Sequence, residues 1–124
     1  MPAAPPPPAV QIFGFEDSQP TRAALRYFKE RRVRVHFVNL KQRPIALGEL
    51  RRFVERLGAA ALLDPASRPY RDQGLSHLSL DEAGIVARAL ATPRLLRLPL
   101  VRHGNQVTAG PAESTWRAWE LVPG

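Results

Sequence analysis

The sequence predicts a single α/β domain built on a four-stranded mixed sheet, with a block of helices inserted between the two halves of the sheet. Three observations support this class. The chain has 124 residues, which is the length of one domain. Two apolar, β-rich runs near the N-terminus flank a helical pattern, which indicates a strand, a helix and a second, parallel strand. A turn signal between two short apolar runs near the C-terminus indicates a hairpin.

The first half of the fold is predicted from residues 10–38. Residues 10–15 form an apolar run typical of a buried strand. Ser18 then offers an N-cap oxygen, and Pro20 suits the first turn of a helix that continues to about Arg31. Residues 33–38 alternate in polarity, which predicts a second strand with one face against the core. Together these elements predict a βαβ unit.

The inserted block is predicted over about residues 45–91. Residues 45–57 carry apolar side chains at helical spacing, and Gly58 supplies a C-cap for that helix. A short helical turn is expected at 59–64, followed by a loop through residues 68–74.

A second inserted helix is predicted from a capping box, Ser79-Leu-Asp-Glu82, in which a serine and a glutamate three residues later satisfy each other's backbone N–H groups. This helix runs to about Ala91, and Pro93 ends it. The side chains expected to face inward are Ala83, Val86, Ala87 and Leu90.

The C-terminal half is predicted as two short strands, 98–102 and 106–109, joined by the turn His103-Gly-Asn105. A final short helix covers residues 114–121. The resulting order, βαβ followed by helices and then ββα, is that of the thioredoxin fold with an insertion between its halves.

The basic charge of the chain is concentrated in one stretch. The formal net charge is +7, and eleven of the 18 cationic residues but only three of the 11 acidic ones lie between Arg22 and Arg56. Such a stretch suits an acidic protein partner or a small anion, and less well nucleic acid, because no base-reading motif accompanies it. A solvated surface is the simpler alternative. The candidates for a partner surface are Arg26, Arg31, Arg32, Arg51, Arg52 and Arg56.

The amino-acid composition limits the cellular compartment and the types of chemistry that can be expected. The sequence has no cysteine, which excludes thiolate chemistry and thiolate metal sites by its own residues, and its histidines lack ligand-like spacing, so no metal site is expected. Residues 1–9 predict a disordered proline-rich tail ahead of a domain at 10–124, with neither a signal peptide nor a membrane-spanning run. These features predict a cytoplasmic protein.

Six segments in the same order and spacing resemble the arsenate reductase/Spx family, usually called ArsC-like, over residues 10 to about 121. These are Phe13-Gly-Phe-Glu-Asp-Ser18, Arg22-Ala-Ala-Leu25, Val38-Asn-Leu-Lys-Gln-Arg-Pro44 before Glu49-Leu50, Tyr70-Arg-Asp-Gln-Gly-Leu75, Pro93-Arg-Leu-Leu-Arg-Leu-Pro-Leu-Val101, and Gly110 with Trp116. The resemblance implies the thioredoxin fold with an ArsC-type insertion.

The resemblance also implies that catalysis is lost. The family's redox cysteine corresponds to Ser18, whose hydroxyl neither forms an accessible anion nor a mixed disulfide. The family's Lys-Arg-Pro run appears as Arg97-Leu98-Pro99, so the arginine that lies against the oxyanion in the reductases is replaced by Leu98. Pro99 resembles the cis-proline of thioredoxin-like folds. Arg71 occupies the family's tyrosine/tryptophan-arginine motif.

Two interpretations of these residues stay open. Ser18 is expected to cap the first helix by accepting a hydrogen bond from the Thr21 N–H. Alternatively, Ser18, Arg71 and Arg97, beside Leu98 and Pro99, form a site for a small anion or for glutathione. A serine-histidine-acid arrangement has no support in the spacing.

The expected function is therefore binding rather than thiol-dependent catalysis. The leading hypothesis is a redox-inactive, ArsC/Spx-like protein without cofactor that binds a protein partner. By resemblance alone, that partner is RNA polymerase, since the Spx branch regulates transcription through it. The alternative is an arsenate reductase-like or glutathione-dependent relic that uses Ser18, Arg71 and Arg97.

Overall fold

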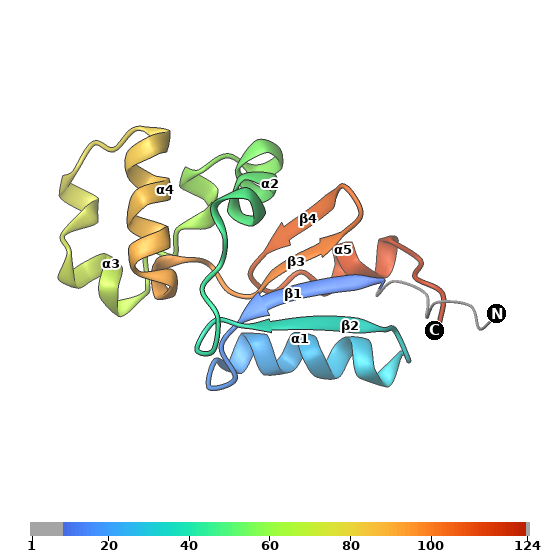
Figure 1. Cartoon of the computed structure of the whole chain (residues 1–124). Helices are drawn as coiled ribbons and strands as arrows, with labels where there is room; N and C mark the ends of the chain where they lie inside the picture. Colours follow the sequence, from blue (N-terminus) through green and yellow to red (C-terminus); the bar gives the residue numbers. More distant parts are fainter. Residues whose placement is uncertain (1–8, 124) are drawn as a thin grey trace.

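The computed structural model describes residues 9–123 and contains one sheet in the order β2-β1-β3-β4 (Figure 1). β1 pairs parallel with β2, whereas β3 pairs antiparallel with β1 and β4, which confirms the predicted fold class. Within the described residues, no helix is long and apolar enough to cross a membrane. The strands are β1 (Val10–Gly14), β2 (Val35–Asn39), β3 (Leu100–His103) and β4 (Gln106–Ala109). The helices are α1 (Gln19–Glu30), α2 (Leu47–Leu57), α3 (Arg68–Asp72), α4 (Glu82–Ala91) and α5 (Glu113–Ala118).

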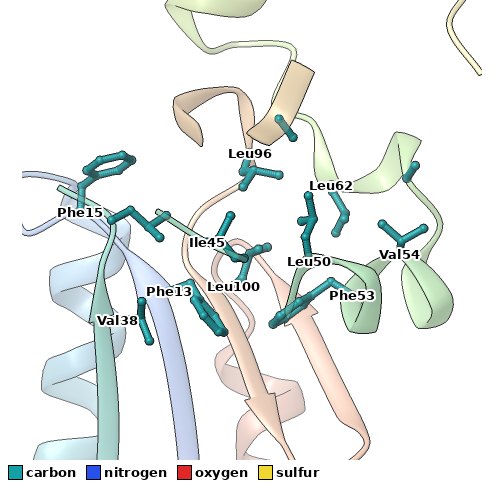
Figure 2. Close-up of a cluster of buried hydrophobic side chains, with 13 residues drawn as sticks. Phe13, Phe15, Val38, Ile45, Leu50, Phe53, Val54, Leu62, Leu96 and Leu100 are labelled. Carbon is teal, nitrogen blue, oxygen red and sulfur yellow. The ribbon is translucent and has the colours of Figure 1, made fainter. Parts of the chain in front are cut away.

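Helices cover both faces of the sheet. Successive side chains of β1 point to opposite faces, so the helices on each side contact a different set of them. Ile12 packs in a cluster with residues of α1 and α5, whereas Phe13 packs in a cluster with residues of α2. Figure 2 shows the second cluster, in which the Phe13 and Phe53 rings meet edge to face with centroids 5.8 Å apart. α1 and α2 therefore lie on opposite sides of the sheet.

The burial of β2 differs from the sequence prediction. Alternation predicted that Val33, Val35 and Phe37 would form the single buried face, yet Val38 is also buried and belongs to the α2 cluster. Val35 and Phe37 pack against the α1 cluster. The strand is thus covered on both faces, because the chain leaving it turns back over the α2 side of the sheet.

The inserted block lies between β2 and β3, as predicted, and α3 and α4 extend beyond the end of the sheet (Figure 1). Leu63, Leu75 and Leu95 form a small core of its own, and an isolated bridge joins Leu63 to Leu96. Three 3-10 turns connect its helices, η1 (Ala60–Leu62), η2 (Leu75–His77) and η3 (Pro93–Leu95).

The segment 68–74 was predicted as a loop, and this prediction is wrong for its first part. Residues 68–72 form the short helix α3. The Ser67 hydroxyl accepts a hydrogen bond from the Tyr70 N–H at 3.3 Å. Pro69 lies in the first turn, where backbone N–H groups have no partner within the helix, so its lack of an N–H costs no hydrogen bond. A one-turn helix with only five residues lacks the periodic signal on which the prediction depended.

The start and the inner face of α4 also need correction. The capping residue is Asp81, whose carboxylate accepts from the Gly84 N–H at 2.8 Å, so Ser79 lies outside the helix. Ala83 and Ala87 are exposed, whereas Ala89 is buried. Because the helix contacts the core along the line through Ile85 and Ala89, the predicted inward face is displaced, although Val86 and Leu90 remain partly buried.

The end of β1 and the start of α1 approach each other closely at Gly14 and Thr21. A Cβ built on Gly14 would lie 2.7 Å from Thr21 Cγ2 and even closer to Thr21 Oγ1, so only glycine fits here. Thr21 is fully buried, and its hydroxyl has no hydrogen-bond partner among the described residues. This close contact fixes the helix start against the strand that precedes it.

α5 is anchored to the sheet by one buried side chain. Trp116 packs on Tyr27 and Phe28 of α1, with ring centroids 5.4 and 5.1 Å away. Its Nε1–H donates to Thr108 Oγ1 at 2.8 Å, on the face of β4 opposite α2. The C-terminal helix is thus held by both apolar contact and a buried hydrogen bond.

The predicted tail, residues 1–9, lies outside the described residues except for Ala9. The Ala9 carbonyl oxygen lies 2.8 Å from His103 Nδ1. The His103 ring in turn packs near Trp119, with centroids 5.6 Å apart. Ala9 therefore belongs structurally to the domain that follows it.

Candidate functional site

Ser18 lies in the turn between β1 and α1, where the sequence places it. Its backbone is extended, and its hydroxyl oxygen accepts a hydrogen bond from the Thr21 N–H at 3.4 Å. The Ser18 N–H donates to the Phe15 carbonyl at 3.0 Å, which closes the turn. Pro20 lies in the first helical turn. The structure thus confirms the predicted capping role of Ser18.

An ion pair beside Ser18 was not predicted. Arg94 of η3 donates from both terminal nitrogens to the Asp17 carboxylate, at 3.0 to 3.2 Å, and its guanidinium carbon stacks 3.9 Å from the centroid of the Phe15 ring. These hydrogen bonds are the main cause that lowers the pKa of Asp17 below its ordinary value. A separation of 77 residues between the partners leaves no local sequence signal for this pair. The pair places a carboxylate next to the N-terminus of α1 and neutralises the charge of Arg94.

Arg97, Leu98 and Pro99 form the segment that enters β3. The Leu98–Pro99 peptide bond is cis, as the resemblance implied, and Pro99 is fully buried. The Arg97 N–H donates to the Leu62 carbonyl at 2.6 Å, and the Arg97 side chain reaches the Leu63 carbonyl at 3.5 Å. The Leu98 side chain packs against the α2 cluster. This segment is therefore held by the inserted block.

Arg71 lies in the last turn of α3, in the inserted block, and its side chain is exposed. Among residues 9–123, no hydrogen bond or ion pair joins Ser18 to Arg71 or to Arg97. Ser18, Arg97 and Pro99 flank the same end of the sheet, since Phe13 pairs with Leu100 in β3. The anion site built from Ser18, Arg71 and Arg97 remains a prediction.

The six arginines predicted as a partner surface are divided between the two faces of the sheet. Three lie on α1 or just after it (Arg26, Arg31, Arg32), and three lie on α2 (Arg51, Arg52, Arg56). Arg31 is held against Tyr27, donating to its carbonyl at 3.0 Å with the guanidinium carbon 3.6 Å from its ring centroid. The three arginines of α2 are exposed and lie in no ion pair of the described chain.

One cation of the basic stretch is neutralised at the start of α2. Arg43 forms a two-pronged pair with Glu49, at 2.9 and 3.0 Å, and Glu49 also accepts from the Ala46 N–H at 2.9 Å. The hydrogen bonds from Arg43 are the largest cause that lowers the pKa of Glu49. Both carboxylate oxygens of Glu49 thus bind Arg43, and in the described chain Glu49 forms no ion pair with the arginines farther along α2.

The described part of the chain shows no activated nucleophile at Ser18. The three histidines lie elsewhere: His36 contacts Gln11 across the sheet, His103 contacts Ala9, and His77 belongs to η2. A serine needs a general base within hydrogen-bond reach in order to attack a substrate. The arrangement at Ser18 is suited to capping a helix and to donating a hydroxyl hydrogen bond.

Comparison with known proteins agrees with this fold. A model of the ArsC family matches residues 13–119. Similar solved structures include the YffB protein (23% identity, TM-score 0.81, covering 88% of this chain and 96% of that one) and an arsenate reductase from Vibrio cholerae (18%, 0.76, 93% and 98%). An arsenate reductase related protein from Brucella melitensis is 19% identical with a TM-score of 0.69, covering 96% of this chain and all of that one. No curated protein matches the sequence.

Proposed function

The chain belongs to the ArsC family and its sequence contains no cysteine, and from this premise we propose that it is a redox-inactive member that acts by binding a protein partner. The observation that carries the proposal is the environment of Ser18. At the position of the family's reactive thiol, as the resemblance implies it, this chain has Ser18, which caps α1. The neighbouring Asp17 carboxylate is paired with Arg94. Neither group offers the anionic nucleophile that thiol-dependent reduction needs.

Position 98 supports the loss of oxyanion chemistry. The resemblance places an arginine there, whereas Leu98 is apolar and packs its side chain against the core. An oxyanion at Ser18 would lie near the Asp17 carboxylate, whose charge Arg94 compensates, but would lack the guanidinium that the resemblance places at position 98. Restoring the chemistry should therefore require at least two changes. We expect arsenate reduction by neither the wild type nor Ser18→Cys alone; activity of the single variant in a glutathione-coupled assay would contradict this.

Two surfaces suit a protein partner. The backbone N–H and carbonyl of Leu98 make no backbone hydrogen bond within residues 9–123, so an extended peptide can pair with them. The arginines of α2 are exposed and form no ion pair among the described residues, which favours an acidic partner and raises its association rate. RNA polymerase is the partner that the resemblance to the Spx branch suggests.

The division of the arginines gives a direct test. Two triple variants reverse equal charge on opposite faces of the sheet: R26E/R31E/R32E on α1, and R51E/R52E/R56E on α2. In affinity capture from the native cell, we expect the α2 variant to lose partners that the wild type and the α1 variant both retain. Retention of the same partners by both variants would overturn the role of these cations, and equal loss by both would indicate non-specific attraction by net charge.

A second candidate function is binding of glutathione or an oxyanion at Ser18, Arg71 and Arg97. It is favoured by the long hydrogen bond to Ser18, 3.4 Å, and by the absence of a carboxylate partner for Arg97 among the described residues. Calorimetry with glutathione, arsenate and phosphate tests it. Heat that disappears in Arg97→Ala would support this site, whereas no heat, or heat unchanged by the substitution, would reject it.

A further inference from the structure

A second basic site lies at the other end of β1 from Ser18. Arg102 of β3 pairs with Gln11 at the start of β1, whereas Ser18 follows the end of that strand. At this end, α2 and the β3–β4 hairpin enclose a cavity of about 350 Å³. Its size is at the lower end of the range for small-molecule sites. None of the candidates at the Ser18 end lines it.

The cavity concentrates positive charge. Its lining includes Arg52 and Arg56 from α2, Arg102 from β3, and one carboxylate, Glu55, which gives a formal charge of +2. Among the ion pairs of the described residues, none involves any of these four. Charges of one sign gathered in a concave surface raise the local concentration of ligands of opposite sign.

Arg102 is held in place without being neutralised. Its Nε–H donates to Gln11 Oε1 at 3.4 Å and its Nη1 donates to the Gly104 carbonyl at 3.1 Å. Both acceptors are uncharged, so the guanidinium keeps its charge and its second terminal nitrogen stays free for a ligand. Partial burial, and next the charge of Arg52, lower the pKa of Arg102, whereas the charge of Glu49 opposes this in part. An anion bound beside Arg102 would offset the repulsion between Arg102 and Arg52.

We infer that this cavity binds a phosphate-bearing small molecule, with Arg52, Arg56 and Arg102 holding its phosphoryl oxygens and Asn105 at the rim offering a side-chain amide. A phosphoryl group suits three arginines better than a carboxylate does, because it presents more oxygens and more charge to planar guanidinium groups. The excess of positive charge and the modest volume suit a small polyanion such as pyrophosphate. The inference does not rest on the proposed protein-binding function.

The test uses the purified full chain and inorganic pyrophosphate, with inorganic phosphate for comparison, followed by amide NMR and calorimetry. We expect saturable binding of pyrophosphate, stronger than that of phosphate, with the largest shifts at the Gly104 and Asn105 amides. Arg102→Gln should weaken it by about 10-fold, the usual effect of losing a charged hydrogen-bond donor. Arg56→Gln, at an exposed position, should weaken it similarly.

Matched controls separate a site from general attraction. Arg26→Gln removes the same charge on α1, across the sheet, and should change the affinity by less than about 2-fold. Glu55→Gln removes the one opposing carboxylate and should tighten binding, whereas Glu30→Gln on α1 should not. No saturable binding, or equal weakening by Arg26→Gln and Arg102→Gln, would overturn the inference. So would displacement of pyrophosphate by a short DNA duplex at lower phosphate concentration, which would point to nucleic acid instead.

Discussion

Two buried threonines should respond in opposite directions to the same substitution, Thr→Val. Thr21 is 0% exposed and its hydroxyl has no partner in the part of the chain that the structure describes, whereas Thr108 is 8% exposed and accepts the hydrogen bond of Trp116. An unsatisfied buried polar group costs about 1–3 kcal/mol. Thr21→Val removes that cost, so the free energy of unfolding should rise by about 1 kcal/mol. Thr108→Val instead leaves the Trp116 N–H unsatisfied and should lower it by about 1–3 kcal/mol.

Differences in secondary-structure propensity between threonine and valine do not account for the expected effects. Threonine and valine are both β-branched and differ little in a helix or in a strand, so the sign of each effect reports the hydrogen bond. Urea unfolding followed by far-UV circular dichroism gives both free energies, and an unchanged m value confirms that the same transition is compared. Destabilisation by Thr21→Val of more than about 1 kcal/mol would refute the reasoning, since it would mean that the Thr21 hydroxyl is satisfied.

Three further predictions concern the same region and its ion pairs. Gly14→Ala would place a methyl group 2.7 Å from Thr21 Cγ2, and should destabilise the protein by about 2 kcal/mol or more in urea unfolding, with partial recovery in the double variant that also carries Thr21→Ala. Arg94→Gln should raise the pKa of Asp17 towards 3.8, as measured by carboxyl NMR titration; an unmoved pKa would mean that the pair does not persist in solution. Because the folded-state pKa of Glu49 lies below 4.5, its contribution to stability is present above about pH 4.5 and is lost as the pH falls through the folded-state value; Glu49→Gln should reduce this acid-induced loss, and an identical pH profile would contradict it.

The parts of the fold that depend on short-range patterns could be predicted from the sequence. The apolar run of β1, the Ser18 cap and the hairpin turn each have a local cause, and the structure places them where expected. Errors occurred where tertiary packing decides. α3 is too short to show periodicity, and the inner face of α4 is set by the residues packed against it, since Ile85 contacts the cluster of Leu63, and Ala89 contacts the α2 cluster.

Side-chain pairs between distant segments could not be predicted in the same way. Asp17 and Arg94 are both exposed, and no residue near either one in the sequence specifies its partner. The position of Arg102 beside α2 could not be predicted from the sequence either. The basic stretch of the sequence ends at Arg56, and only the packing of α2 against β4 brings Arg102 beside that helix. The fold therefore places the arginines of one basic stretch on opposite faces of the sheet, and brings the arginines of α2 close to Arg102 from outside that stretch.

The two ends of β1 consequently differ in the chemistry that they offer. At the Ser18 end, the Asp17 carboxylate is paired with Arg94 and Leu98 is apolar, so Arg97 is the cation of its own segment that has no carboxylate partner among the described residues. At the hairpin end, three guanidinium groups face one carboxylate, and neutral acceptors position Arg102 without reducing its charge. Keeping like charges close in a partly buried place costs stability unless a ligand compensates them. Because the sequence has no thiol to place at the Ser18 end, we expect an anion to bind instead at the hairpin end, where three arginines line one cavity.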